Sequence, residues 1–212
     1  MTTTALLSTT YFGPVQWYQK LHRYGRTQLE VHETFAKQTY RNRCIIATAQ
    51  GTQALTVPVS PGDDHSILKV KISDHGNWRH LHWQAITSAY GDAPFLEYYE
   101  DDLRPFFTER RWEFLVDFNE DITRKMCDLI DIHPHLTRTD KYRKSADFID
   151  AYKEDVQVTD FRNSIQPKHP GTDSDFEPRP YYQVFSRRHG FLPNLSILDL
   201  LLNMGPEAIF YL

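Results

Sequence analysis

Aromatic, basic and amide side chains are concentrated in three short segments of the first half of the chain, 11–18, 37–44 and 73–83. Solvated surface rarely gathers these residue types, and a core disfavours Arg and Lys because a buried charge is costly unless it is paired. A ligand pocket accommodates the mixture, since pockets combine aromatic walls with a few placed polar groups. The three segments therefore predict one shared pocket for a small molecule.

The densest polar group lies in the second segment and consists of Lys37, Tyr40, Arg41, Asn42 and Arg43. The planar guanidinium of arginine holds a phosphate or a carboxylate through two parallel hydrogen bonds. A strand over 40–44 would place Arg41 and Arg43 on one side of the chain. The residues alone favour a solvated basic loop, whose surface ion pairs contribute under about 1 kcal/mol each. The alternative is a binding site for the diphosphate of a nucleotide sugar, and only the family resemblance described below favours it.

The aromatic candidates for the pocket walls are Tyr11, Phe12, Trp17 and Trp78. Tyr11-Phe12-Gly13-Pro14 lies between an expected strand and an expected helix, which is where ligands bind in open α/β sheets. The start of the following helix would also favour an anionic group. The alternative is a packing turn in which the Tyr and the Phe are simply buried.

Three histidines in the third segment, His75, His80 and His82, could transfer protons, because imidazole titrates near neutral pH. We predict His75 and His80 as the catalytic base candidates and no metal site. Zinc ligands on a helix are usually spaced by four residues, whereas His80 and His82 are two apart and point to different sides. His82 lies on the apolar face of the expected helix, so we expect it inside and His80 outside.

Three further polar residues have structural explanations. Asn119 interrupts an apolar helical stripe and is expected to brace a backbone turn, because a buried amide must find partners. Asp199 follows Ser196 by three residues, the spacing of a capping box. The alternative for Asp199 is an inward carboxylate that orients a histidine or an amine. Cys44 has no Cys-His arrangement around it, which favours a small buried thiol.

The elements that must position these residues form an α/β fold over a single domain, 1–212. A strand at 4–8, a helix after Pro14 and a strand at 27–32 begin an α/β unit, and a hairpin follows within 44–59. The remaining expectations are a strand at 69–72, helices at 78–89, 111–132 and 196–203, and a strand at 181–185. Between 139 and 180, prolines and charges replace apolar periodicity, so we expect an irregular excursion. The expected architecture is thus a small mixed sheet, a helical middle, the excursion and a C-terminal helix.

The composition excludes several classes of protein. A net charge of −4 over 212 residues argues against a nucleic-acid binder, which needs a basic surface. The two cysteines, Cys44 and Cys127, give no disulfide framework and fit a reducing compartment. No run approaches the roughly 20 apolar residues that cross a bilayer. We therefore expect a cytoplasmic protein with no membrane span and no bound cofactor, and the oligomeric state stays open.

Motifs along nearly the whole chain resemble the WbqC-like proteins of bacterial surface-polysaccharide gene clusters. The resemblance is carried by these segments: Tyr11-Phe12 with Pro14, Lys37-Gln38, Tyr40-Arg41-Asn42-Arg43, Leu55-Thr56-Val57-Pro58-Val59, Ile72-Ser73-Asp74 with Trp78, Tyr90, Pro94-Phe95, and Pro193-Asn194-Leu195-Ser196-Ile197-Leu198-Asp199. One departure is Gly13, which replaces the first of two consecutive prolines in the family's usual opening. The resemblance implies a role in modifying an amino sugar, by attachment of glycine or another acyl group.

Two functions fit these observations. The first is a transferase that moves an acyl or aminoacyl group onto a nucleotide-linked amino sugar, with the arginines on the diphosphate, the aromatic residues as walls and His75 or His80 as base. No phosphate loop for activating a carboxylate with ATP is visible. The alternative is a non-catalytic binding or scaffold protein of the same pathway, which would use the same pocket without a titrating base. Replacing His75 and His80 separates the two, since only an enzyme has turnover to lose.

Overall fold

A computed structural model describes residues 2–60, 62, 65–144 and 156–212 of the chain. Its main sheet has four parallel strands in the order β7-β2-β1-β8. The strands are β1 (Thr2–Ser8), β2 (Arg26–Glu30), β7 (Leu136–Arg138) and β8 (Val156–Asp160). Because all four run the same way, their carboxyl ends meet at one edge of the sheet.

Helix α1 (Val15–Arg23) joins β1 to β2 and completes the expected strand-helix-strand unit. In β1 the run Ala5-Leu6-Leu7 is wholly buried, as is typical of a parallel strand covered on both faces. Between β1 and α1 the chain makes a tight turn in which Phe12 has a φ of 41°, in the left-handed region that bulky side chains rarely adopt.

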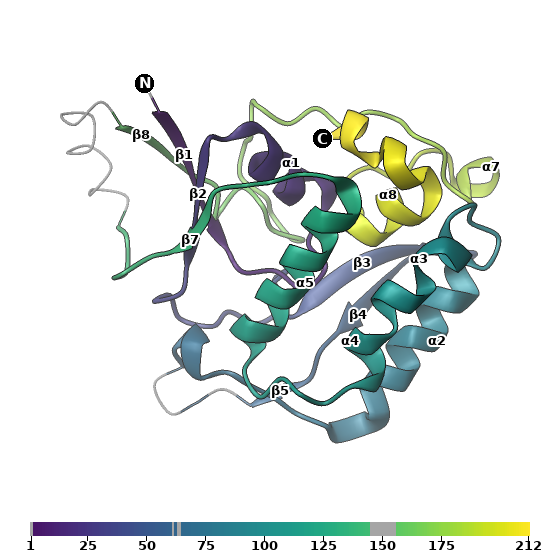
Figure 1. Cartoon of the computed structure of the whole chain (residues 1–212), viewed down its shortest axis with the longest axis horizontal. Helices are drawn as coiled ribbons and strands as arrows, with labels where there is room; N and C mark the ends of the chain where they lie inside the picture. The colour runs from purple at the N-terminus through teal and green to yellow at the C-terminus, as the bar shows by residue number, and fades with distance from the viewer. Residues whose placement is uncertain (1, 61, 63–64, 145–155) are drawn as a thin grey trace.

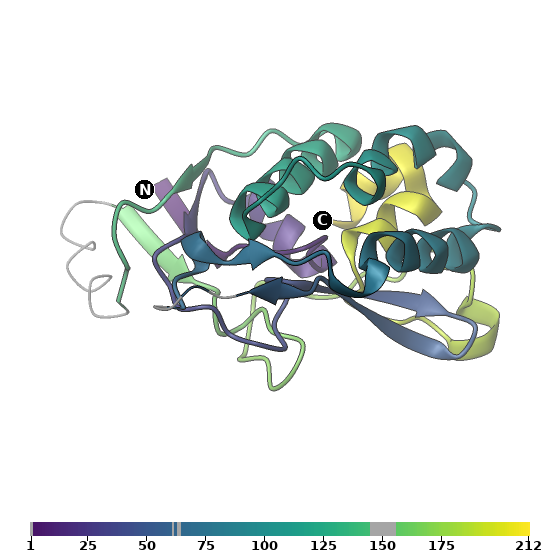
Figure 2. The ribbon, with the colours of Figure 1, turned by 90° about the horizontal axis from the view of Figure 1, so that it is seen from below.

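The rest of the fold consists of short antiparallel ribbons and helices. The ribbons pair β3 (Arg43–Thr48) with β4 (Gly51–Thr56), and β5 (Val59–Ser60) with β6 (Lys71–Ile72). The helices are α2 (Trp78–Tyr90), α3 (Leu96–Leu103), α4 (Pro105–Thr108), α5 (Leu115–Ile130), α7 (Ser186–His189) and α8 (Ile197–Met204), with 3₁₀ turns at Ile67–Lys69, His75–Asn77 and Gly205–Tyr211. In Figures 1 and 2 the parallel sheet lies at one end of the molecule and α2, α3, α4 and α8 lie toward the other, with the β3–β4 ribbon along them.

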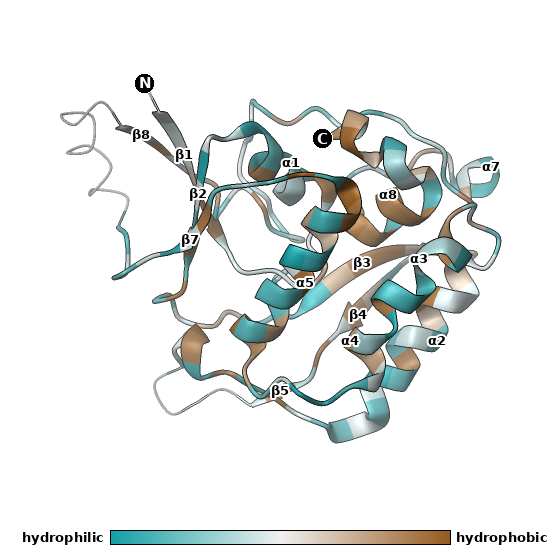
Figure 3. Cartoon of the chain, viewed as in Figure 1, coloured by the Kyte–Doolittle hydropathy of each residue, from teal (hydrophilic) through white to brown (hydrophobic). Residues whose placement is uncertain are grey.

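The core between these parts is strongly aromatic. The ring of Phe12 stacks on Phe107 at 5.8 Å, and Phe118 packs against Trp112 at 4.9 Å. Helix α8 is buried from Ile197 to Asn203, and Figure 3 shows it hydrophobic along most of its length. A helix that is apolar on nearly all sides is usually buried. Helix α8 is therefore a central part of the core among the helices.

The α/β class and most of the expected helices and strands are confirmed, with several differences. Strand β8 lies within 139–180 and pairs with β1, although that range was expected to be irregular. The described residues 161–180 do lack regular helix or strand. The expected strand at 181–185 is wrong, since this stretch is irregular before α7. Strand β7 and helices α3, α4 and α7 were not expected. Among the described residues, no helix is long and apolar enough to cross a membrane.

Candidate functional site

The carboxyl ends of the parallel strands carry a dense set of charged side chains and a cavity. The cavity has a volume of about 430 Å³ and is lined by His32, Glu33, Thr34, Arg41, Tyr142, Arg162 and Asn163. Most of these residues follow β2, β7 or β8 within a few positions. In open α/β sheets, ligands bind outside the carboxyl ends of the strands, so this cavity is the candidate functional site.

Arg41 and Glu33 form a buried, two-pronged ion pair on one side of the cavity. Arg41 Nε donates to Glu33 Oε1 at 2.8 Å, and Arg41 Nη2 donates to Glu33 Oε2 at 2.5 Å. Ser8, at the end of β1, joins the pair: its hydroxyl donates to Glu33 Oε2 at 3.1 Å and accepts from Arg41 Nη2 at 2.9 Å. Parallel bonds of this kind fix the guanidinium plane. Arg41 is thus held in one orientation, and its Nη1 has no hydrogen bond to the part of the chain that the structure describes.

A second arginine is held in a similar way by the end of β8. Arg162 donates from Nε and Nη2 to the two oxygens of Asp160, at 2.9 and 2.7 Å, and its Nη1 lies 3.5 Å from Glu30 Oε2. Burial by itself would lower the pKa of Arg162, but the hydrogen bond and charge of Asp160 outweigh it and the pKa is raised. The guanidinium lies 5.2 Å from the ring centre of Tyr142, which is half exposed.

Glu30, the last residue of β2, is a fully buried carboxylate that organises the edge of the sheet. Its Oε1 accepts from the Thr139 hydroxyl and from the His32 backbone N–H, both at 2.9 Å. Its Oε2 accepts the Arg143 backbone N–H at 2.8 Å. A buried carboxylate is tolerated when its lone pairs are satisfied in this way. Glu30 therefore joins the chain segments that follow β2 and β7.

His32 is the histidine that lines the cavity. Its Nε2 lies 2.9 Å from the Thr139 carbonyl oxygen, and because a carbonyl can only accept, Nε2 carries the hydrogen. In the neutral ring, Nδ1 is then the nitrogen with a free lone pair. The His32 side chain is exposed to solvent, so it can meet a ligand without moving core residues.

A narrow crevice of about 10 Å³ continues from the cavity toward Ser8. It shares Arg41 and Arg162 with the larger cavity and is also lined by Thr10, Trp17 and Tyr40, among others. The Thr10 hydroxyl is buried and has no hydrogen-bond partner among the described residues. A space of this size holds about one water molecule.

The aromatic residues predicted as pocket walls mostly lie in the core instead. Tyr11, Phe12 and Trp78 are at most 4% exposed and contact one another or neighbouring rings. The Tyr11 hydroxyl lies 2.9 Å from His82 Nδ1. Burial lowers the pKa of His82 to about 4, partly opposed by a hydrogen bond to the Thr56 backbone. The expected burial of His82 and exposure of His80 are both confirmed. Trp17 alone of the predicted walls reaches the crevice.

The polar residues of the predicted pocket are dispersed. The expectation that a strand aligns Arg41 and Arg43 is wrong, because β3 begins at Arg43 and Arg41 precedes it. Arg43 Nε donates to the Thr56 hydroxyl at 3.0 Å, across the ribbon. Lys37, His75 and His80 are exposed, and none of them is among the residues lining the described cavity. Their functional roles stay predictions.

The remaining expected polar residues support the backbone or the core. Asn119 Nδ2 donates to the Arg41 carbonyl at 2.8 Å, which confirms its bracing role, and Asn42 Nδ2 similarly donates to the Val57 carbonyl.

Ser196 caps α8 by accepting the Leu198 N–H, but the capping role expected for Asp199 is wrong. The Asp199 carboxylate is buried and accepts hydrogen bonds from three side chains: Tyr90, Tyr181 and Gln183. Burial raises its pKa, which those hydrogen bonds oppose.

Sequence reasoning missed His32, Glu33, Tyr142 and Arg162. A usable signal was present for the first two, because His32 ends the strand expected at 27–32 and Glu33 directly follows it, at a strand end where ligand-binding residues gather. For Arg162 the signal was hidden, because β8 was not expected and Asp160-Phe161-Arg162 therefore did not stand at a strand end.

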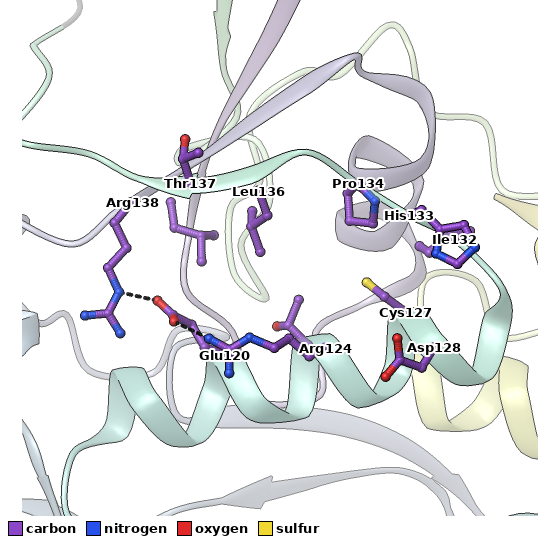
Figure 4. A pocket seen from close by; sticks show the side chains of 12 residues that line it. Glu120, Arg124, Cys127, Asp128, Ile132, His133, Pro134, Leu136, Thr137 and Arg138 are labelled. Carbon is purple, nitrogen blue, oxygen red and sulfur yellow. Dashed lines mark hydrogen bonds and ion pairs between the residues drawn. The ribbon is translucent and has the colours of Figure 1, made fainter.

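A second cavity, of about 480 Å³, lies between α5 and β7. Figure 4 shows Glu120 and Arg138 at one end, joined by a hydrogen bond of 2.6 Å, and Ile132, His133 and Pro134 at the other. The Arg138 pKa is raised by its hydrogen bonds to Glu120 and Asp117. Burial raises the pKa of the Cys127 thiol to about 12, so it is a poor nucleophile there. This cavity lies against β7 itself rather than beyond the carboxyl ends of the strands, where ligands bind in open α/β sheets, so the sheet edge is the better candidate.

The fold and the site together define an α/β protein with a charged cavity at the carboxyl edge of a parallel sheet. The chain belongs to the WbqC-like protein family, whose model matches residues 9–211. It is similar to the uncharacterized protein Rv1507c of Mycobacterium tuberculosis, with 27% identity over 195 residues that cover 84% of this chain and 83% of that protein. No solved structure matches the chain.

Proposed function

We propose that this protein is a transferase that binds a nucleotide-linked amino sugar at the carboxyl edge of its parallel sheet and attaches an acyl or aminoacyl group to the sugar amine. One observation carries the proposal: two arginines, a histidine and a carboxylate, namely Arg41, Arg162, His32 and Glu33, line one cavity of about 430 Å³. Membership of the WbqC-like family supports a role in surface-polysaccharide biosynthesis.

The arginines suit the diphosphate of the substrate. Among the contacts recorded for the described residues, Arg41 Nη1 has no partner, and Arg162 Nη1 has only the 3.5 Å approach to Glu30. Because the other guanidinium nitrogens are already fixed by carboxylates, little side-chain entropy is lost when a phosphate binds. The ring of Tyr142 beside Arg162 offers a surface for a sugar or a base.

His32 suits the proton transfer that acylation of an amine requires. The amine nitrogen gains a bond to the acyl carbon and must release a proton, and a base within hydrogen-bond reach accelerates this step. The hydrogen bond from Nε2 to the Thr139 carbonyl leaves Nδ1 as the accepting atom. His75 and His80, proposed from the sequence, are the competing assignment.

A binding protein without turnover is the second candidate, and the pairing of the arginines favours it. Glu33, Asp160 and Glu30 already balance the charge of Arg41 and Arg162. Such a site holds its ligand by shape and hydrogen bonds, with less net attraction for a dianion. It would bind the same sugars and release them unchanged.

The test combines binding and turnover. Isothermal titration with UDP-glucosamine measures binding, with UDP-glucose as the control that lacks the amine. Incubation with UDP-glucosamine and acyl thioesters or aminoacyl esters, followed by mass spectrometry, measures acylation. We expect His32→Gln to lower turnover by about 100-fold or more with binding retained, and the double variant His75→Gln/His80→Gln to behave as wild type. Binding of UDP-glucosamine without an acylated product from any donor would support the binding protein instead.

A further inference from the structure

Ser8 has the surroundings of an activated nucleophile. It is the last residue of β1, its side chain is partly exposed, and it lines the crevice that shares Arg41 and Arg162 with the larger cavity. Its hydroxyl donates to the Glu33 carboxylate at 3.1 Å and accepts from the Arg41 guanidinium at 2.9 Å. Nucleophilic serines are recognised by such an arrangement, in which a base touches the hydroxyl and a third group orients the base.

We propose that Ser8 is acylated during the reaction, an inference that rests on the proposed acyl transfer. Ser8 Oγ attacks the carbonyl carbon of an activated acyl donor, a thioester or an ester. Glu33 accepts the hydroxyl proton and passes it to the departing thiol or alcohol as the donor's bond to the acyl carbon breaks. The product is an ester between Ser8 Oγ and the acyl group.

The sugar amine then completes the cycle. Its nitrogen attacks the carbonyl carbon of the ester, the bond from that carbon to Ser8 Oγ breaks, and an amide forms. The proton lost by the amine returns to Ser8 Oγ, which restores the free enzyme. No electrons are transferred, and the thioester or ester supplies the only activation needed.

Arg41 assists this step, because its Nη2 donates to Ser8 Oγ at 2.9 Å. This hydrogen bond stabilises the negative charge that develops on the oxygen as its proton moves to Glu33.

Ser8 is better placed to accept an acyl group than the other candidate nucleophiles. Burial raises the pKa of the Cys44 thiol well above its usual range, so little thiolate forms at neutral pH. The Thr10 hydroxyl in the same crevice is fully buried and touches no recorded base. Ser8 alone, of the hydroxyls that the structure describes in this crevice, contacts a carboxylate and a guanidinium together.

The experiment is a covalent trap with p-nitrophenyl acetate as the acyl donor. Intact-protein mass spectrometry and peptide mapping follow the adduct, and release of p-nitrophenolate gives the rate. We expect an early release of one equivalent and one acetyl group on Ser8. Ser8→Ala should lower the rate of adduct formation by about 100-fold or more, whereas Ser88→Ala, at an exposed serine of α2, should leave it unchanged. Ser8→Cys should still become acylated, and thermal melts confirm that the variants fold.

A chase with UDP-glucosamine separates this inference from the proposed function. Loss of the acetyl group from Ser8 with formation of acetylated sugar supports both. An adduct on Ser8 that the sugar does not discharge supports the nucleophile but contradicts the proposed acceptor. Acylated sugar formed equally well by Ser8→Ala would overturn the covalent route while leaving the transferase intact. The absence of any adduct on Ser8 in the wild type would also overturn it.

Discussion

At the scale of single residues, Arg41 combines a structural and a functional position. Its side chain is 91% shielded from solvent and is tied to Glu33 and Ser8. Arg43, two residues later, makes one hydrogen bond to a threonine at the ribbon. The sequence pattern could not separate these two arginines, because the partner of Arg41 is eight residues away and becomes visible only in the fold.

Arg41→Ala should therefore destabilise the protein strongly, by about 3–5 kcal/mol, because it leaves the Glu33 carboxylate buried without its counterion. Arg43→Ala should cost about 1 kcal/mol or less, since only one hydrogen bond is lost. Urea unfolding at pH 7, with the midpoint and slope fitted for both variants, measures the difference. Equal destabilisation by the two substitutions would show that the Arg41–Glu33 pair is not held as described.

His82 should make stability depend on pH. Its pKa is about 4 in the folded chain and about 6.5 when unfolded, so the unfolded state takes up a proton first as the pH falls. The stability from burying the neutral ring is fully present above pH 6.5 and is lost between there and pH 4, with a change of about 2–3 kcal/mol.

The measurement is urea unfolding at pH 7 and at pH 4.5 for wild type, His82→Gln and His80→Gln. We expect His82→Gln to be less stable than wild type at pH 7 but to lose less stability on acidification, because glutamine does not titrate. His80→Gln, at an exposed position, should follow wild type at both values. If His82→Gln and wild type lose the same stability between the two values, His82 is not the titrating group.

At the scale of elements, the turn between β1 and α1 sets the position of the sheet edge. A Cβ atom at Gly13 would lie 2.4 Å from Thr10 Oγ1, closer than Cβ atoms come to other heavy atoms in folded proteins. Phe12, beside it, has a φ of 41°. In this turn a residue with a Cβ at position 13 would therefore meet Thr10.

Gly13→Ala should accordingly destabilise the fold by about 1–3 kcal/mol through overpacking. Gly25→Ala is the matched control, because nothing lies within 4 Å of its added Cβ. Thr10→Ala removes the obstructing oxygen, which has no recorded partner, so the double variant Gly13→Ala/Thr10→Ala should recover part of the loss. Thermal melts of wild type and the three variants measure these differences in stability. Identical melting temperatures for both glycine variants would show that the turn has room for a side chain.

Helices and strands that depend on neighbouring residues could be predicted from the sequence, whereas those that depend on distant segments could not. The strand-helix-strand start and helix α2 were found because alternation and helical periodicity are local. Strand β8 has five residues among prolines and charges, and its stability comes from pairing with β1, about 150 positions earlier. Such distant partners are not encoded in local periodicity, and Arg162, which depends on β8 for its position, was missed with it.

At the scale of the whole molecule, the aromatic core and the charged cavity lie in different places. Tyr11 and Trp78, from two of the segments rich in aromatic and basic residues, do meet, but in the packed core, while Lys37, His75 and His80 stay exposed. The charged cavity forms instead at the carboxyl edge of the sheet, mainly from residues that follow β2, β7 and β8. The sequence indicated correctly that buried arginines must be paired with a carboxylate or a ligand. The order of the strands determines where these pairs form.

The most direct test of this account compares ligand binding by two double variants. His32→Ala/Tyr142→Ala alters exposed residues at the sheet edge, and His75→Ala/His80→Ala alters exposed histidines near the start of α2. Isothermal titration with UDP-glucosamine should show affinity reduced by about tenfold or more, or 1.4 kcal/mol, for the first variant, and unchanged for the second. Loss of binding in the second variant with full affinity in the first would place the ligand elsewhere and contradict the account.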